Sequence, residues 1–329
     1  MNAFRLQPIR RMPVLALSVL AMAASLAAAA WSPPSSFGSP AAGSDEPQAV
    51  ARQGRYSLTG RIRPLLFWIG KDDVGEARIA WLAGQDGGRG YELLIGSDPE
   101  HAPRKINRWG YIAERGERGA VQVLGFMTEV DEETLEQAKA GVEGPQPGVR
   151  AFKIIQSSVL PNEATAMVTG AMLPDRLTYR DLEAVKRDLP LPAVAPQRVE
   201  VPPGAQPGFL FAMASLLHEN VETYLRTGRP PANGQRSYIH GDKLYDVVTQ
   251  SSRFVKRAAF KGREFPNVID SEFRTRSRDG GGGSKYRIVY GTEGPWREVP
   301  VRIVYRPKWW FEAEMVLTDV HYDAAGRQP

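Results

Sequence analysis

Residues 298–319 read EVPVRIVYRPKWWFEAEMVLTD, and apolar side chains alternate with polar ones through both halves of this stretch. A period of two is the pattern of a β-strand with one buried face, and only a short polar segment separates the halves. The stretch therefore predicts a hairpin of two antiparallel strands. Its buried face is predicted to carry Val299, Val301, Ile303, Tyr305, Trp309, Phe311, Ala313, Met315 and Leu317.

The same pattern predicts the register of this hairpin. A three-residue loop at Arg306–Lys308 places Ile303 opposite Phe311, whereas a two-residue loop would place Ile303 opposite Glu312. The three-residue loop also brings Arg302 opposite Glu312 on the outer, solvated face, where the two charges form a favourable cross-strand pair.

The N-terminus has the three parts of a secretory signal peptide. Residues 1–13 carry three arginines and no acidic residue, residues 14–30 are apolar, and this run ends in small residues at Ala28–Ala30. A transmembrane anchor is the alternative, but the apolar run is short for a membrane span. We expect cleavage near Ala30, no transmembrane segment in the mature chain, and a periplasmic or secreted protein of a bacterial envelope.

The composition excludes several classes of site and partner. The chain has 329 residues and no cysteine, which excludes disulfides, thiol catalysis and metal centres held by cysteine. The formal net charge of +5 includes the three arginines of the signal peptide, and the other basic residues are scattered along the chain. We therefore expect no nucleic-acid partner.

Shifts in composition divide the rest of the chain into four segments. Residues 31–54 are rich in Ser, Pro, Gly and Ala and predict a disordered leader. Residues 55–173 carry strand patterns and predict an N-terminal β domain. Residues 174–207 predict a helix and a proline-rich linker that contains the domain boundary, and residues 208–322 predict a C-terminal β domain.

The predicted fold class is mainly β with a few helices. One short helix is expected to begin at Asp131, and another at Thr178, where Asp181 completes a capping box. A longer helix is expected over Gly208–Arg226, because its apolar residues recur at three- and four-residue spacing. We expect two antiparallel-sheet domains, the C-terminal one a curved sheet or half-barrel with this long helix packed on it.

Residues 97–117 are predicted to form a long loop whose central part, Arg104–Tyr111, is rich in Arg, Asn and aromatic residues. Such residues recognise anions and sugar rings, because planar donors and stacking surfaces coincide. In the alternative interpretation, Trp109 and Tyr111 fill the core beneath the loop, which is the usual place of large aromatic side chains.

A search for catalytic motifs finds no nucleophile elbow, phosphate-binding loop or zinc-protease motif. The four histidines are far apart, and none has a metal-ligand spacing with another: His101, His218, His240 and His321. We therefore assign no catalytic residue and expect no metal and no cofactor.

Glu312 and Glu314 are the paired carboxylates with a defined geometry, because they lie two residues apart on one strand face beside Trp310. Carboxyl groups about 7 Å apart could serve an inverting glycosidase. Acidic residues that alternate along a solvated face are ordinary, however, and Arg302 would keep Glu312 ionised. Truncating Glu314 should then cost little stability, and a glycan-acting hydrolase of the cell envelope is the alternative function.

The C-terminal third of the chain resembles a group of known folds through the order of its motifs. A helix at residues 220–224 precedes strands around Lys243–Tyr245 and Phe260–Gly262, and Val299–Val301 then leads to the final apolar strand. In this order the part from 238 to 317 resembles periplasmic domains of unknown function with a lipoprotein-carrier-like half-barrel. The resemblance implies a curved antiparallel sheet with a helix across its concave side, and by shape it implies lipid or lipoprotein handling. The sequence between residues 56 and 172 resembles no known family.

We predict a non-enzymatic binding or scaffolding module for an apolar or envelope ligand, with a lipid, a lipoprotein or another envelope component as its partner. Aromatic and aliphatic side chains of the long helix and the final hairpin could line an apolar concavity. A dry, packed core would use the same residues. The predicted lining is Phe209, Met213, Tyr305, Trp309 and Phe311.

Overall fold

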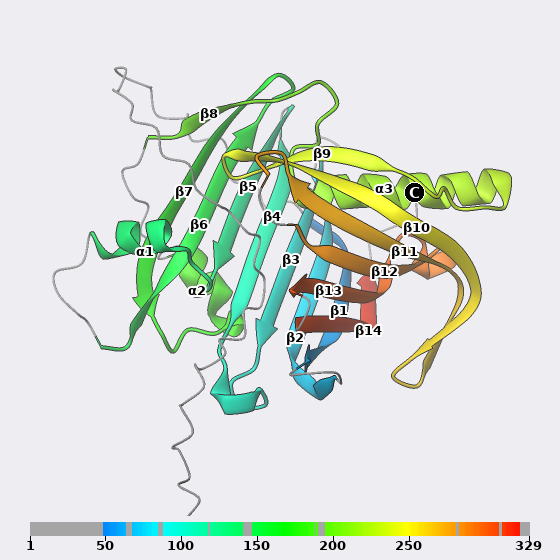
Figure 1. Cartoon of the computed structure of the whole chain (residues 1–329), viewed down its shortest axis with the longest axis horizontal. Coiled ribbons are helices and arrows are strands. Elements are labelled where there is room, and N and C mark those ends of the chain that lie inside the picture. The colour runs from blue at the N-terminus through cyan, green and yellow to red at the C-terminus, as the bar shows by residue number, and fades with distance from the viewer. Residues whose placement is uncertain are drawn as a thin grey trace, which may run out of the picture.

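A computed structural model describes residues 49–63, 68–84, 88–117, 119–140, 147–187, 189, 195–280, 283–308 and 311–322 (Figure 1). The predicted signal peptide and most of the predicted leader lie outside the described residues. Within the described part of the chain, no helix is long and apolar enough to cross a membrane.

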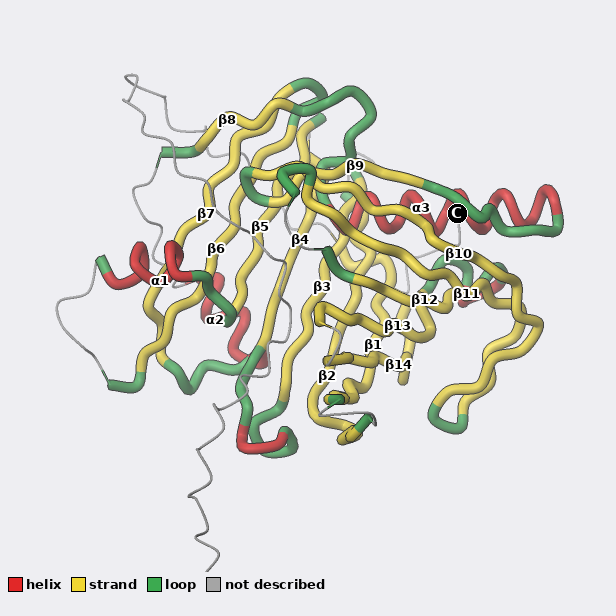
Figure 2. Tube along the Cα trace, in the orientation of Figure 1, coloured by secondary structure: helices red, strands yellow, loops and turns green. Residues whose placement is uncertain are grey.

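Strands make up most of the described chain, as Figure 2 shows. The first eight strands are β1 (Ala49–Ile62), β2 (Ile69–Ala83), β3 (Arg89–Ser97), β4 (Trp109–Glu117), β5 (Ala120–Met127), β6 (Val149–Val159), β7 (Glu163–Pro174) and β8 (Gln197–Glu200). The other strands are β9 (Gln235–His240), β10 (Lys243–Phe260), β11 (Arg263–Ser277), β12 (Lys285–Gly291), β13 (Pro300–Lys308) and β14 (Phe311–Tyr322). The helices are α1 (Glu132–Lys139), α2 (Leu182–Arg187) and α3 (Phe209–Thr227).

These strands form one 14-stranded antiparallel sheet in the order β8-β7-β6-β5-β4-β3-β2-β1-β14-β13-β12-β11-β10-β9. Consecutive strands pair with each other, except that β8 and β9 lie at opposite edges of the sheet and that β1 pairs with β14. The first and last strands of the chain therefore meet in the middle of the sheet (Figure 1). The prediction of a mainly β fold built from antiparallel strands is confirmed, and the sheet is curved without closing into a barrel.

The largest core lies between α3 and the surrounding strands. Side chains of α3 pack against aromatic and aliphatic residues from β1, β2, β3 and β9 to β14. The helix buries one face, as its apolar spacing predicts, and the buried residues are Phe209, Ala212, Met213, Leu216, Leu217, Asn220 and Val221. Its last turn ends at Gly228, which adopts the left-handed conformation at φ 72°.

A carboxylate from the other half of the sheet caps the start of α3. Gly208 precedes the helix and has no side chain, and the carboxylate of Glu114 on β4 accepts the N–H groups of Leu210 and Phe211, both at 2.9 Å. A Cβ atom at Gly208 would lie 2.2 Å from the Glu114 carboxyl carbon, so only glycine leaves room for this contact. Burial raises the pKa of Glu114 to about 7, although these N–H groups act in the opposite direction.

A second core fills the N-terminal half of the sheet, and it corrects the prediction of a long loop over residues 97–117. Trp109 and Tyr111 belong to strand β4, are 1% and 2% exposed, and pack against this core together with α2. The Trp109 indole N–H donates to the carbonyl of Leu177 at 3.2 Å. The core-filling interpretation of these two aromatic residues is therefore the correct one.

The register predicted for the final hairpin is wrong. Ile303 pairs with Met315 and Tyr305 pairs with Ala313, instead of Ile303 with Phe311. The two registers differ by an even number of residues, so both keep the apolar side chains on one face, and alternation alone cannot distinguish them. Lys308 pairs with Phe311, and residues 309–310 lie outside the described residues.

One predicted boundary shifts in the structure. Strand β1 begins at Ala49, within the leader predicted to end at residue 54, because residues 49–55 hydrogen-bond to β2 despite their polar composition. In the predicted linker, Thr178 and Asp181 form the expected capping box, and β8 adds a short strand to the edge of the sheet. The segments 55–173 and 208–322 are the two halves of one sheet, and their independence as domains stays a prediction.

Candidate functional site

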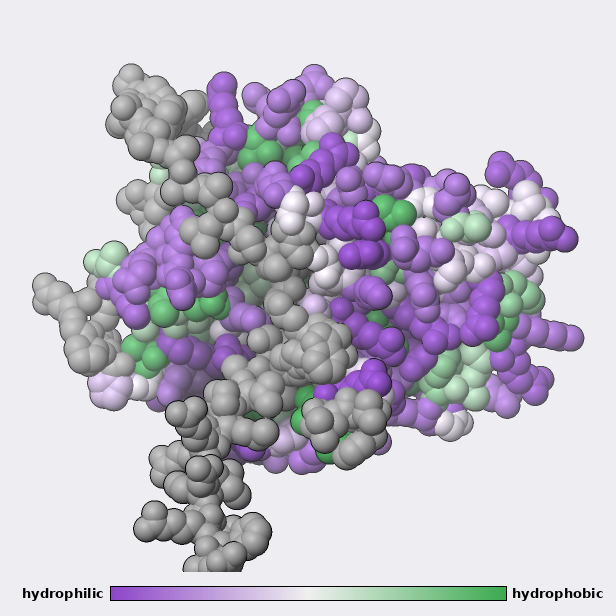
Figure 3. All heavy atoms as spheres, in the orientation of Figure 1, coloured by the Kyte–Doolittle hydropathy of each residue, from purple (hydrophilic) through white to green (hydrophobic). Residues whose placement is uncertain are grey.

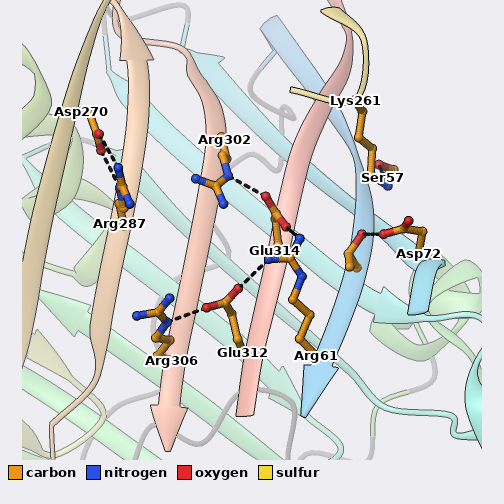
Figure 4. Close-up of polar contacts among 11 residues, drawn as sticks. Ser57, Arg61, Asp72, Lys261, Asp270, Arg287, Arg302, Arg306, Glu312 and Glu314 are labelled. Atoms are coloured by element: carbon orange, nitrogen blue, oxygen red, sulfur yellow. Dashed lines mark hydrogen bonds and ion pairs between the residues drawn. The ribbon is translucent and has the colours of Figure 1, made fainter. Parts of the chain in front are cut away.

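Arginines and carboxylates form a ladder of ion pairs across neighbouring strands from β10 to β14 and β1, and Figure 4 shows its part from Asp270 to Arg61. Ile303 and Met315 point toward α3 and belong to its core, so the alternate residues Arg302 and Glu314 lie on the opposite side. We call this side of β10 to β14 and β1 the charged face. It is made up of Arg61, Arg253, Asp270, Glu272, Arg287, Arg302, Arg306, Glu312 and Glu314.

The charged face contains a depression of about 340 Å³ between β10, β11 and β12. In Figure 3 hydrophilic residues predominate on the visible surface of these strands. The lining of the depression is polar throughout and consists of Ser251, Ser252, Arg253, Asp270, Glu272 and Arg287.

Asp270 is a buried residue of this lining, and its carboxylate holds two arginines in place. Its carboxylate accepts the Nε and Nη2 groups of Arg287 at 2.8 and 2.6 Å, and the Nη2 group of Arg253 at 2.9 Å. Burial alone would raise the pKa of Asp270, but the hydrogen bonds from Arg287 and Arg253 outweigh it and hold the pKa below its usual value. Arg253 keeps 68% of its side chain exposed, so its remaining N–H groups can reach a ligand.

Glu312 and Glu314 lie farther along the ladder and are buried, at 3% and 6% exposure. Arg306 Nε lies 2.5 Å from Glu312, and Arg302 Nε lies 2.5 Å from Glu314. Arg61 on β1 contacts both carboxylates from the other side. This arrangement follows from the strand order, because β14 lies between β13 and β1 and its carboxylates therefore face arginines on both sides.

Two predictions about these residues are thereby corrected. Glu312 and Glu314 do not lie on a solvated face, and Arg302 contacts Glu314 instead of Glu312. The reason for the second error is the shifted register of the hairpin. The reason for the first is that neighbouring arginine side chains on both flanking strands surround the carboxylates.

This geometry does not favour acid catalysis by the carboxylate pair. An inverting glycosidase needs its two carboxyl groups free to reach a glycosidic oxygen and a water molecule. Three arginines surround Glu312 and Glu314. The pair is therefore suited to holding the arginines of the charged face in fixed positions.

The tip of the β10–β11 hairpin bends back and bounds one end of the charged face (Figure 1). The Arg302 guanidinium lies 5.1 Å from the centre of the Phe260 ring, within the range of a cation–π contact. At the same tip, Lys261 Nζ lies 3.0 Å from both Ser57 Oγ and Asp73 Oδ1. These contacts connect the hairpin tip to β1 and β2.

Four of the five residues predicted to line an apolar concavity come together in the core of α3. Phe209, Met213, Tyr305 and Phe311 are 7%, 6%, 2% and 1% exposed. The Phe209 ring lies 5.5 Å from the rings of both Tyr238 and Tyr286. Trp309 lies outside the described residues. A ligand-binding role for this group stays a prediction.

Sequence reasoning missed the depression around Asp270. Its residues come from three strands, and each one alone looks like an ordinary polar position of an alternating strand. The alternation of inward and outward positions along each strand was the available signal, because it places Arg253, Asp270 and Arg287 on the outward side. This alternation does not show which outward residues of different strands become neighbours, because that depends on the register of each pair of strands.

No protein-family model matches the chain, and no curated protein matches it. Among solved structures, the chain is similar to a β-barrel-like protein of the domain of unknown function DUF1849 from Brucella abortus. The TM-score is 0.37 and the identity 8%, over 84% of this chain and 98% of that one.

A second similar structure is a putative exported protein with a YmcC-like fold from Bacteroides fragilis. The TM-score is 0.26 and the identity 7%, over 84% of this chain and 97% of that one. The first description is of a domain of unknown function and the second is of an exported protein. Neither description names a ligand or a reaction.

Proposed function

We propose that this chain is an exported, non-enzymatic binding module of the cell envelope and that its ligand docks on the charged face. The observation that carries the proposal is the polar depression of about 340 Å³, which Arg253 and Arg287 help to line. Concave sites of this size with a few convergent polar groups are typical of ligand binding.

The donors and acceptors of the depression favour an acidic glycan as the ligand. A guanidinium group carries five N–H donors in a planar fork that matches a carboxylate, and Asp270 uses only some of those on Arg253 and Arg287. The Ser251 hydroxyl and the exposed carboxylate of Glu272 offer partners for sugar hydroxyls. An apolar ligand is less well served, because the lining of the depression is polar.

A calorimetric titration tests this proposal. The mature protein is titrated with soluble acidic oligosaccharides, first peptidoglycan fragments and then uronic-acid oligomers. Hydrogen bonds to charged groups contribute about 1.5–3 kcal/mol, so Arg253→Gln should weaken binding about tenfold or more. Arg257→Gln is the matched control, since Arg257 lies on the same strand, is 72% exposed and pairs with Glu264.

Two outcomes would contradict the proposal. Equal affinities of the Arg253→Gln and Arg257→Gln variants would place the ligand elsewhere. A lipid that co-purifies with the protein from its native host, seen by native mass spectrometry and lost on Met213→Ala, would favour the apolar concavity instead.

The alternative function, a glycan hydrolase, is tested on the same substrates. We expect no sugar release from peptidoglycan, because arginine side chains already contact the carboxylates of Glu312 and Glu314. Release of sugars that is abolished by Glu312→Gln or by Glu314→Gln would establish an enzyme.

A further inference from the structure

Three metal-ligating side chains meet at the outer side of α3, away from the charged face. His218 and Glu222 lie four residues apart on the helix and so share one face. Glu298, in the connection before β13, places a carboxylate oxygen 2.9 Å from Nδ1 of His218. One ligand atom from each of the three residues lies within 4.8 Å of the other two.

We propose that His218, Glu222 and Glu298 bind a divalent transition metal of the zinc class. Zn²⁺ takes imidazole nitrogen and carboxylate oxygen at about 2.0–2.2 Å, and three protein ligands with one water complete a tetrahedral site. Small side-chain rotations bring donors that lie within 4.8 Å of one another to these distances. The His218 side chain is 60% exposed, so both a metal ion and a water molecule can reach it.

The Arg297 guanidinium lies beside both carboxylates of this cluster, where a metal cation would bind. Its guanidinium contacts the Glu222 carboxylate, and its Nε lies 3.5 Å from the Glu298 carboxylate. A metal ion that binds both carboxylates replaces these contacts, and the Arg297 side chain, 44% exposed, turns into solvent. Arg297 therefore competes with the metal, and its removal strengthens metal binding.

A bound ion would join α3 to the connection between β12 and β13. His218 and Glu222 belong to the helix, whereas Glu298 belongs to the sheet side of the core. Since a ligand that binds only the folded state stabilises it, the melting temperature rises when metal is added. The inference does not rest on the proposed glycan site, because none of its residues lies on the charged face.

The test is a zinc titration of chelator-treated, full-length mature protein, followed by competition with a chromophoric chelator. We expect one Zn²⁺ ion per wild-type chain and a rise in Tm of a few degrees, about 2–4 °C for each kcal/mol of binding linkage. His218→Ala and Glu222→Gln should each lower the affinity at least tenfold. Arg297→Gln should raise it.

The matched control is His321→Ala, which removes an exposed histidine that pairs with Asp319 at 2.8 Å outside this cluster. It should leave both the stoichiometry and the affinity unchanged. All variants change exposed or half-exposed side chains, and circular dichroism verifies that they fold. The inference is overturned if wild-type protein binds no stoichiometric zinc, if His218→Ala binds as tightly as wild type, or if Arg297→Gln binds more weakly.

Discussion

At the scale of single residues, Glu314 is buried in an ion pair, whereas the alternating sequence pattern predicts a solvated glutamate. Glu314 is 6% exposed, and its carboxylate forms ion pairs with Arg302 and Arg61. Phe311, on the other face of the strand, is 1% exposed and lies in the core. Glu314→Gln leaves Arg302 without its carboxylate partner, whereas Arg61 keeps Glu312, and breaking a buried pair in this way costs about 3 kcal/mol. Phe311→Ala should cost about 3–5 kcal/mol.

Urea unfolding of both variants measures these costs, with Glu264→Gln as the control for an exposed glutamate. Glu264 is 62% exposed, and its replacement should change stability by less than about 0.5 kcal/mol. A Glu314→Gln variant as stable as Glu264→Gln would mean that the carboxylate is solvated after all.

Two buried titratable residues, His240 and Glu114, should make opposite contributions to the pH dependence of the free energy of unfolding. Burial, and then the charge of Lys153, lowers the pKa of His240 to about 4, and no hydrogen-bond partner for its ring nitrogens is found among the described residues. Burial raises the pKa of Glu114 to about 7. His240 therefore contributes stability that is complete above about pH 6.5 and is lost as the pH falls toward 4. Glu114 contributes stability that is complete below its unfolded pKa and is lost as the pH rises through 7.

These two contributions nearly cancel between pH 4.5 and pH 6.5, so the wild-type free energy of unfolding should vary little there. Glu114→Gln removes one of them, and its stability should rise with pH by about 3 kcal/mol over this window, at 1.36 kcal/mol per pKa unit. Chemical unfolding at a series of pH values measures the effect. A variant curve parallel to the wild-type curve would show that Glu114 titrates normally in the folded state.

At the scale of elements, α3 is predictable from sequence, but its N-terminal cap is not. Three- and four-residue spacing predicts the helix, and Phe209–Thr227 is helical in the structure. The capping carboxylate of Glu114 is 96 residues away from Leu210, whose N–H group it accepts. No local pattern carries that information, because the contact depends on how the sheet curves around the helix.

Gly208→Ala tests this cap directly. The new methyl group would meet the Glu114 carboxyl group and displace it, so the first N–H groups of α3 lose their acceptor. We expect faster hydrogen exchange at Leu210 and Phe211. Gly125→Ala is the control, since its nearest neighbour would lie at an ordinary 3.5 Å, and it should leave the exchange of α3 unchanged. Equal exchange in both variants would contradict the cap.

In the final hairpin, the alternating sequence pattern predicts which side chains are buried but does not predict the register of the two strands. Its two strands and their buried faces are predicted correctly, since Val301, Ile303, Phe311 and Leu317 all lie in the core. Its register is not predicted correctly, because shifting the strand pairing by any even number of residues keeps the same side chains on the same face. The ion pairs of the charged face depend on that register and therefore could not be predicted.

At the scale of the whole molecule, the pairing of β1 with β14 joins the two halves of the chain. The resemblance to a curved antiparallel sheet with a helix across it predicts the C-terminal half well. The sequence contains no signal for the β1–β14 contact, which links residues more than 240 positions apart, such as Leu58 and Met315.

This pairing predicts the behaviour of a chain cut between its halves. A protease site inserted after Leu189 should give two fragments that co-elute in gel filtration, because β1 and Glu114 of one fragment bind β14 and α3 of the other. The fragments should separate only in denaturant. Two folded fragments that separate in buffer would show that the two halves are independent domains. They would contradict a stable pairing of β1 with β14.

The central claim, that the ligand docks on the charged face, is tested most directly by NMR of protein labelled with ¹⁵N-arginine and ¹³C-methyl-methionine. The side-chain Nε–H signals of Arg253 and Arg287 and the methyl signal of Met213 are followed while acidic glycan fragments are added. The account predicts shifts at Arg253 and Arg287, with Arg257 and Met213 unchanged. Shifts at Met213 with no change at Arg253 or Arg287 would contradict it and place the ligand in the core around α3.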